Sequence, residues 1–140
     1  MVFSCLLWQL LREESLMKFA DVNELCHLIR ETSFDIHRFH RQCHLEKCCE
    51  NALAHRLRKR GIEERQQYPL SVCDEGGTLL GEFFADLFIE NRLIVELKAV
   101  RAVLDEHLAQ LLGHLRSGRI ETGLPINFGA RSVREEIPDD

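Results

Sequence analysis

The sequence predicts a mixed α/β domain, of the α+β type, in which helices flank a central, mostly antiparallel meander of about three to four strands. Two observations support this fold class. Apolar side chains recur at helical spacing in residues 17–60 and 104–118. Shorter apolar runs separated by turn residues, which are typical of strands, occupy residues 62–72, 78–89 and 92–100. The 140 residues are enough for one domain with one core.

Two helices are predicted in the N-terminal half. The first begins at Met17, and its apolar positions at roughly helical spacing are Leu25, Leu28, Ile29 and Ile36. The second covers residues 44–60 and ends before Gly61, which follows a basic last turn. The apolar stripe of this second helix, which we expect to be buried, comprises Leu45, Cys48, Cys49, Ala52, Leu53 and Leu57.

A third helix is predicted for the segment DEHLAQLLGHLRSG, ending at Gly118 or nearby. Its expected buried face comprises Leu104, Leu108, Leu111, Leu112 and Leu115. The strands before it include one that enters a turn at Asp74–Gly77 and two that form a hairpin. The apolar segment GLPINFG (Gly123–Gly129) then supplies one more strand after the helix.

The chain divides into an N-terminal extension of residues 1–16, a single domain of residues 17–130 and an acidic tail of residues 131–140. The extension is either an added amphipathic helix or the product of an upstream start codon, with Met17 as the true start. It has no basic segment and no small-residue cleavage site, so a signal peptide is not expected. We therefore expect a cytoplasmic protein whose six cysteines are free and mostly buried.

Composition and charge narrow the class of protein. No apolar run approaches the roughly 18 residues that a membrane span requires, so a membrane protein is not expected. The net charge of −5 argues against a generally basic surface that coats nucleic acid. The cluster HRLRKR (His55–Arg60) is a local exception. It either contacts phosphates or satisfies the preference of a helix end for basic residues.

The segment FADLFIENRLIVELKAV carries three charged residues in the most hydrophobic part of the chain. If Asp86 lies opposite Glu96 in an antiparallel hairpin, residues 90–92 remain as the loop. One face is then entirely apolar, with Ala85, Leu87, Ile89, Leu93, Val95 and Leu97. The other face gathers the charges, with Asp86, Glu96 and Lys98 beside Phe84, Phe88 and Ile94.

Two neighbouring carboxylates repel each other. Burying either one as an ion costs roughly several kcal/mol unless an opposite charge or hydrogen bonds compensate for the lost hydration. A divalent metal removes this conflict, because Mg²⁺ is typically held by one or two carboxylates plus waters. Lys98, two residues from Glu96 on the same face, can orient a water or stabilise charge on a phosphate. With Asp86 these residues form a minimal set for metal-assisted phosphodiester hydrolysis. The alternative is a solvated sheet face on which Glu96 and Lys98 pair with neighbours.

The order of these segments resembles the GxxExxY protein family, which is placed in the PD-(D/E)xK nuclease superfamily and has a restriction-endonuclease-like core. The resemblance extends from about Asp21 to Gly129. Its segments are the helix ending LRKRG, then ADLFIENRLIVELKAV, EHLAQLLGHLRSG and GLPINFG. The specific part, Asp86 to Phe128, carries D, ExK, H-x-x-Q and INF at the separations of the family.

The resemblance implies that Asp86 and Glu96 are metal ligands, with the backbone carbonyl of Leu97 as a third. It also implies that Lys98 is the catalytic lysine. Gln110 matches a polar helix position that faces the active site in related nucleases, and His107 lies one turn before it.

Glu46 matches the glutamate of the family's naming motif, and the resemblance makes it an accessory acidic group or ligand. The glycine and the tyrosine of that motif are replaced here by Cys43 and Cys49. These departures weaken what is inferred about the helix that carries them and leave Asp86 and Glu96 untouched.

Other histidines and cysteines invite a zinc interpretation. The segment FHRQCHLEKCC gathers His40, Cys43, His44, Cys48 and Cys49, but not at the usual spacing of paired zinc ligands. We expect Cys48 and Cys49 to be buried structural residues, and His114, on the third helix, to lie at the surface.

The sequence thus predicts a metal-dependent endo- or exonuclease that hydrolyses DNA or RNA with Mg²⁺ or Mn²⁺. The alternative is a non-catalytic nucleic-acid-binding or protein-interaction domain that keeps the nuclease fold. A stand-alone zinc-binding protein is a third, weakly supported alternative. A domain of this size has little surface with which to enclose a duplex, so a homodimer or a protein partner is also considered.

Overall fold

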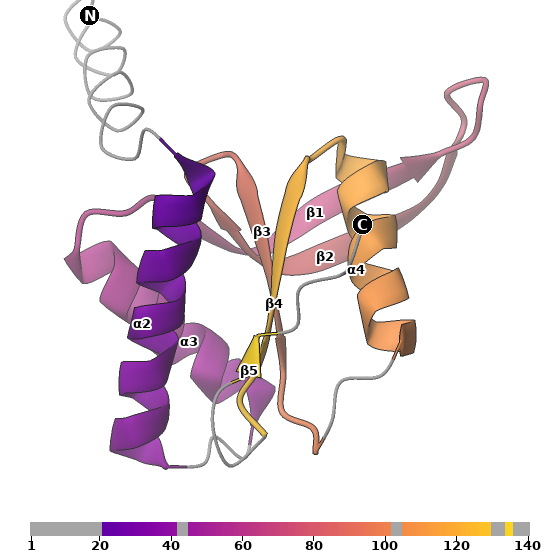
Figure 1. Ribbon diagram of the computed structural model, residues 1–140. Helices are drawn as coiled ribbons and strands as arrows, with labels where there is room; N and C mark the ends of the chain where they lie inside the picture. Colours follow the sequence, from indigo (N-terminus) through magenta and orange to yellow (C-terminus); the bar gives the residue numbers. More distant parts are fainter. Residues whose placement is uncertain (1–20, 42–44, 102–104, 130–133, 136–140) are drawn as a thin grey trace, which may run out of the picture.

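The computed structural model describes residues 21–41, 45–101, 105–129 and 134–135. The proposed boundaries after residues 16 and 130 lie outside these ranges. The elements, in chain order, are α2 (Val22–His40), α3 (Glu46–Lys59), β1 (Glu64–Cys73), β2 (Leu79–Ile89), β3 (Leu93–Lys98), α4 (Asp105–Gly118), β4 (Thr122–Asn127) and β5 (Arg134–Glu135) (Figure 1). The mixed α+β fold class is confirmed, and the arrangement is consistent with a restriction-endonuclease-like core.

The strands form one sheet in the order β1-β2-β3-β4-β5. The first three form an antiparallel meander, whereas β4 is parallel to β3 and β5 is antiparallel to β4. A parallel pair cannot be joined by a tight turn, and the crossover from β3 to β4 contains α4. The mostly antiparallel sheet agrees with the prediction.

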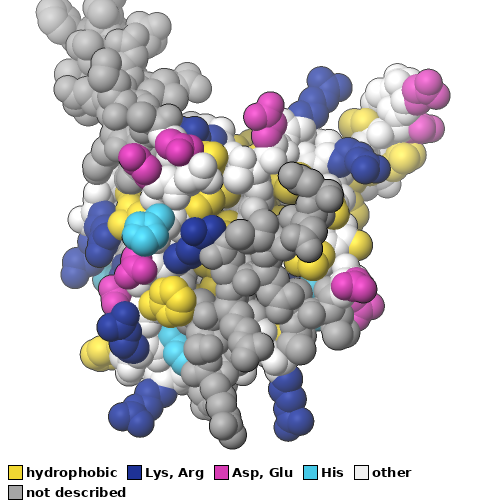
Figure 2. Space-filling model, viewed as in Figure 1, with side chains coloured by type: hydrophobic (Ala, Val, Ile, Leu, Met, Phe, Trp, Pro, Cys, Tyr) yellow, Lys and Arg dark blue, Asp and Glu magenta, His cyan; other side chains and the backbone are white. Residues whose placement is uncertain are grey.

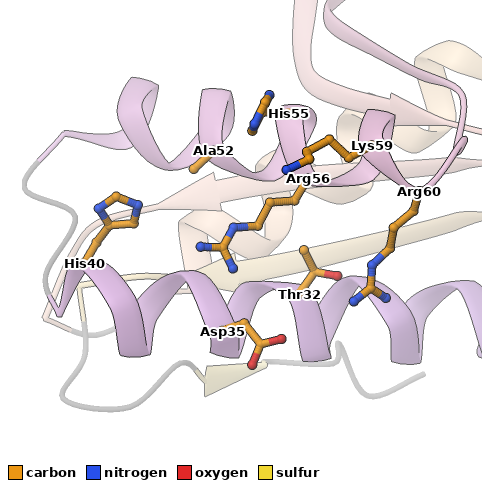
Figure 3. A pocket seen from close by; sticks show the side chains of 8 residues that line it. All are labelled: Thr32, Asp35, His40, Ala52, His55, Arg56, Lys59 and Arg60. Atoms are coloured by element: carbon orange, nitrogen blue, oxygen red, sulfur yellow. The ribbon is translucent and has the colours of Figure 1, made fainter.

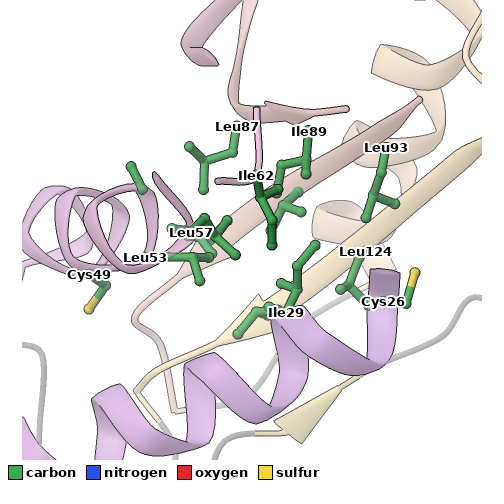
Figure 4. Packing of buried hydrophobic residues seen from close by; sticks show 14 of the residues in the cluster. Cys26, Ile29, Cys49, Leu53, Leu57, Ile62, Leu87, Ile89, Leu93 and Leu124 are labelled. Carbon is green, nitrogen blue, oxygen red and sulfur yellow. The ribbon is translucent and has the colours of Figure 1, made fainter. Parts of the chain in front are cut away.

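Helices cover both faces of this sheet (Figure 1). On one face, α2 and α3 pack against the strands, and their buried contacts include Ile29, Leu53 and Leu57 with Leu87, Ile89 and Leu93 (Figure 4). On the other face, Leu111 of α4 packs in a smaller cluster with Leu70, Ala85, Phe88 and Ile94. None of the helices among the described residues is long and apolar enough to cross a membrane.

The hairpin register is the one predicted. The pairs are Leu87 with Val95, Phe88 with Ile94 and Ile89 with Leu93, which leaves Glu90, Asn91 and Arg92 in the loop. Leu87 and Ile89 face α2 and α3, and Phe88 faces α4. Ala85 departs from the predicted sorting, because it packs in the α4-side cluster instead of with Leu87.

The buried face of α3 is narrower than predicted. Cys49, Leu53 and Leu57 are fully buried, but Leu45 is 65% exposed and Cys48 is exposed. Leu45 is the N-cap residue and precedes the first helical turn, and Cys48 is rotated by about 100° from Cys49. The expectation that both cysteines are buried is therefore wrong for Cys48.

The buried face of α4 also differs. Leu111 and His114 are buried, whereas Leu112 is 49% exposed. Burial is predicted for leucines alone, of which Leu104 lies outside the described residues, but the face that packs on the sheet contains Leu111, His114 and Leu115. The expectation that His114 lies at the surface is wrong. Of the four cysteines in the described part of the chain, Cys26 is also buried and Cys73 is exposed.

Candidate active site

Asp86 lies where the pairing of β2 with β1 is interrupted for one residue and its pairing with β3 has ended. Towards β1, Gln66 pairs with Leu87 and Tyr68 with Ala85, but the pair between them is skipped, and Gln67 has a φ of 51°. Towards β3, the ladder ends at the pair formed by Leu87 and Val95. Asp86 is therefore held at an irregularity of β2.

The carboxylate of Asp86 accepts a hydrogen bond that a backbone carbonyl would accept in a regular sheet. Its Oδ2 accepts a hydrogen bond from the backbone N–H of Leu97 at 2.7 Å. In a continued ladder a backbone carbonyl would accept from that strand instead. Oδ1 lies 3.4 Å from Nε2 of Gln67, which donates to it. A side chain thus joins β2 to β3 where their backbones no longer pair.

Glu96 occupies a strongly desolvated position, with its side chain 12% exposed. Burial is the main reason why its pKa is raised to about 8, and the nearby Asp86 carboxylate raises it further by repulsion and by a side-chain hydrogen bond. Lys98 counteracts part of this effect. At neutral pH the carboxyl group of Glu96 is therefore mainly protonated in the metal-free protein.

His114 of α4 is the hydrogen-bond partner of Glu96. Its Nδ1 lies 2.6 Å from Oε1 of Glu96, and the histidine side chain is 6% exposed. Burial lowers the pKa of His114, with Lys98 adding to the decrease and Asp86 opposing it. Nε2 is buried and has no hydrogen-bond partner in the described part of the chain. The neutral imidazole holds the Glu96 carboxyl group in one orientation.

Lys98 lies on the same strand face as Glu96, two residues further along β3. Its positive charge acts to lower the pKa of both Glu96 and His114. The ammonium forms no hydrogen bond or ion pair with the residues that the structure describes. Asp86, Glu96 and Lys98 are thus brought together, and the lysine remains available for another partner.

Two residues of α3 approach the same region. Oε1 of Glu46 accepts a hydrogen bond from the backbone N–H of Ala99 at 3.2 Å, one residue beyond Lys98. Glu50 is 2% exposed and accepts from Nε2 of Gln67 at 2.6 Å. Gln67 therefore connects the carboxylates of Glu50 and Asp86.

Sequence reasoning missed Glu50 and His114. Each lies one helical turn after a residue that it did identify, Glu46 and Gln110 respectively, so helical spacing was the available signal. Gln110 itself is exposed and forms no hydrogen bond within the described residues. On α4, His114 is hydrogen-bonded to the Glu96 carboxyl group.

Asn127 and Gly129 fix the end of β3 nearest to Lys98. Oδ1 of Asn127 accepts from the backbone N–H groups of Val100 at 3.1 Å and of Gly129 at 2.9 Å. A Cβ atom at Gly129 would lie 2.4 Å from the nitrogen of Val100, so only glycine fits this close approach of two backbones. The segment Gly123–Gly129, predicted as the last strand, therefore also holds the backbone that follows Lys98 in place.

The donor set fits a hard divalent cation. Asp86 and Glu96 are two carboxyl groups whose mutual repulsion and burial oppose ionisation, and a cation between them would remove that opposition. No group of three His, Cys, Asp or Glu side chains within the described ranges is placed to hold a metal. Two carboxylates completed by backbone oxygen and water correspond to the ligation of Mg²⁺ better than to that of Zn²⁺.

Comparison with known proteins agrees with this geometry. No curated protein and no solved structure is significantly similar to the chain. A family model described as the PD-(D/E)XK nuclease superfamily, however, matches residues 23–138, which include every element from α3 to β5 and nearly all of α2. The chain belongs to the PD-(D/E)XK nuclease superfamily.

Proposed function

We propose that this chain is a metal-dependent nuclease that hydrolyses phosphodiester bonds of DNA or RNA, with Mg²⁺ or Mn²⁺ as its cofactor. The observation that carries the proposal is the Glu96 carboxyl group, whose pKa is raised to about 8 beside Asp86. Such strongly perturbed groups concentrate at functional sites. Nucleases of this superfamily generally use divalent metals. A bound divalent cation would offset the repulsion between the carboxyl groups of Asp86 and Glu96.

In this proposal Asp86 and Glu96 hold the metal, with the backbone carbonyl of Leu97 as a third ligand. The cation supplies Lewis-acid stabilisation of the negative charge that develops on the phosphate. Lys98, whose ammonium has no partner in the described residues, positions the attacking water or a phosphate oxygen. The position of Lys98 next to Glu96 on β3 keeps these two functions on one rigid strand.

Three further residues take supporting roles. His114 is a positioning residue, because its 2.6 Å contact fixes the carboxyl group of Glu96 before the metal binds. Glu46 is an accessory acidic group at the Lys98 end of the site, where it bonds the backbone of Ala99. Gln110, exposed on α4, contacts the substrate instead of the metal.

Within the superfamily, we infer that the chain is a divergent member of the GxxExxY family. Glu46 of the naming motif is present and lies near the proposed site, whereas the positions of its glycine and tyrosine hold Cys43 and Cys49. Cys43 lies outside the described residues, and Cys49 is packed in the core. The domain then corresponds to residues 17–130, with residues 1–16 and 131–140 as extensions.

The test combines metal binding with cleavage. Mg²⁺ and Mn²⁺ are titrated by calorimetry into the wild type, the Glu96→Gln variant and the Glu82→Gln variant, an exposed control on β2. The same proteins are incubated with single- and double-stranded DNA and RNA. Metal binding and metal-dependent cleavage that are lost only in Glu96→Gln support the proposal.

Two other outcomes separate the alternatives. Metal binding without cleavage of any substrate would favour a domain that keeps the site but needs a partner subunit or a second copy to complete it. Absence of metal binding in the wild type would refute the catalytic proposal and favour a non-catalytic nucleic-acid-binding or protein-interaction domain.

A further inference from the structure

A pocket lies between α2 and α3, apart from the candidate active site. Its volume is about 470 Å³, within the range of small-molecule sites. It is lined by side chains of α2 and α3, namely Thr32, Asp35, His40, Ala52, His55, Arg56, Lys59 and Arg60 (Figure 3). Nothing in the proposed nuclease chemistry uses these residues.

The pocket is separate from the carboxylate site, because the residues of α3 that line the pocket and those that contact the sheet lie on different sides of the helix. Glu46 and Glu50 face the sheet, where they bond Ala99 and Gln67. His55 and Lys59 lie about one helical turn apart on a different side of the helix, and both line the pocket. A ligand bound there would not touch Asp86 or Glu96.

Positive charge predominates in the pocket, although the whole chain carries a net charge of −5. Arg56, Lys59 and Arg60 are basic side chains, and Asp35 is the single carboxylate among the eight residues of the lining. Asp35 also forms an exposed ion pair with Arg38 at 3.6 Å. In the space-filling view, Lys, Arg and His side chains are interspersed with Asp and Glu side chains over the α2 side of the molecule, so the excess of positive charge belongs to the pocket lining and not to this whole side (Figure 2).

Two of the cationic side chains, Arg56 and Lys59, are not explained by structural pairing among the described residues. Arg58, which lies between them in the sequence, forms an ion pair with Glu64 and so anchors α3 to β1. Arg56 and Lys59, in contrast, form no hydrogen bond or ion pair with any residue that the structure describes. A preference of the helix end for basic residues accounts for their sequence position, but not for the hollow that they line.

The geometry of the lining suits an anion with several oxygen atoms. Arg56 and Arg60 extend from α3 towards α2, and His40 projects from the end of α2 towards the same space (Figure 3). Guanidinium groups recognise phosphate through paired hydrogen bonds. We propose that this pocket binds the phosphate groups of a compact polyanion such as a di- or triphosphate.

The phosphates could belong to a free phosphorylated compound or to a nucleic-acid backbone. The probes are therefore inorganic pyrophosphate and a single-stranded DNA decamer, titrated by calorimetry into the full chain in metal-free buffer. The pocket variant is Arg56→Gln/Lys59→Gln. The control, Arg65→Gln/Arg116→Gln, removes the same charge at exposed positions on β1 and α4, outside the pocket lining.

We expect pyrophosphate to bind the wild type and to bind the pocket variant at least about tenfold more weakly, with little change in the control. If binding of the DNA decamer falls in parallel, the phosphates are those of nucleic acid; if it does not, the ligand is a free compound. The proposal is overturned if pyrophosphate does not bind the wild type at millimolar concentration. It is also overturned if both variants weaken binding equally, because only general charge attraction would then be involved.

Discussion

Replacing Glu96 with glutamine should make the stability of the protein less dependent on pH. The pKa of Glu96 is raised from 4.5 to about 8 in the folded state. An acid with a raised pKa in the folded state contributes stability at low pH. This contribution is lost as the pH rises from the unfolded-state pKa towards the folded-state pKa, because the unfolded chain ionises first.

The magnitude follows from these two values. Each unit of pKa difference corresponds to about 1.4 kcal/mol, so ionisation of this residue in the unfolded chain should lower the free energy of unfolding by about 2–3 kcal/mol between pH 5 and pH 7. Glutamine has a similar shape and does not ionise, and its amide can donate to Nδ1 of neutral His114. The stability difference between Glu96→Gln and the wild type should therefore increase by that amount over this pH range.

Urea denaturation in EDTA at several pH values measures the effect, with Glu82→Gln as an exposed control on β2. Added Mg²⁺ should then stabilise the wild type more strongly at pH 8 than at pH 5, because the metal binds the ionised carboxylates. A stability difference between the Gln variant and the wild type that does not change with pH would refute the assignment of a buried, repelled carboxyl group at this position.

Three further substitutions distinguish residues that take part in catalysis or metal binding from a residue that only stabilises the fold. Lys98→Met should reduce metal-dependent cleavage by about 100-fold or more while leaving the metal affinity from calorimetry nearly unchanged, and a matched loss of metal binding would contradict its role. His114→Ala should weaken Mg²⁺ binding, and restoration by His114→Gln would show that the residue acts by orienting Glu96. Gly129→Ala should lower the free energy of unfolding by about 3 kcal/mol, because its Cβ would lie 2.4 Å from the nitrogen of Val100. Gly81→Ala, which meets no atom within 4 Å, is the control, and equal effects of the two glycine substitutions would contradict the packing argument.

The β2–β3 hairpin was predictable because its apolar residues alternate and a shift by one residue would have divided the charges between two faces. That constraint fixed the pairing of Ile89 with Leu93, which the structure confirms. The faces of α3 and α4 were less predictable. Counting apolar residues gave no weight to His114, although its imidazole can be buried when Glu96 accepts or donates a hydrogen bond.

The irregularity at Asp86 could not be predicted, because it depends on the backbone of another strand. Gln67 adopts a φ of 51°, which a residue other than glycine adopts at a cost of about 1 kcal/mol or more. In this conformation its side chain reaches both Glu50 and Asp86. Nothing in the residues around Gln67 marks it as a turn, and the benefit arises only from contacts with α3 and β2.

The same irregularity explains how a hydrophobic hairpin can carry a polar site without losing its sheet. If the ladder between β2 and β3 continued, the backbone N–H of Leu97 would be bonded to a carbonyl and would not be available to the Asp86 carboxylate. Because the ladder stops, Asp86 replaces that carbonyl at 2.7 Å and is held beside Glu96 by a hydrogen bond that also closes the sheet. The hydrogen bond that keeps the strands together therefore also holds two carboxyl groups close together, and their repulsion adds to the rise in the pKa of Glu96 that burial mainly causes. A cation that binds both groups would relieve this repulsion while leaving the Asp86–Leu97 bond in place, so metal binding requires no rearrangement of the strands.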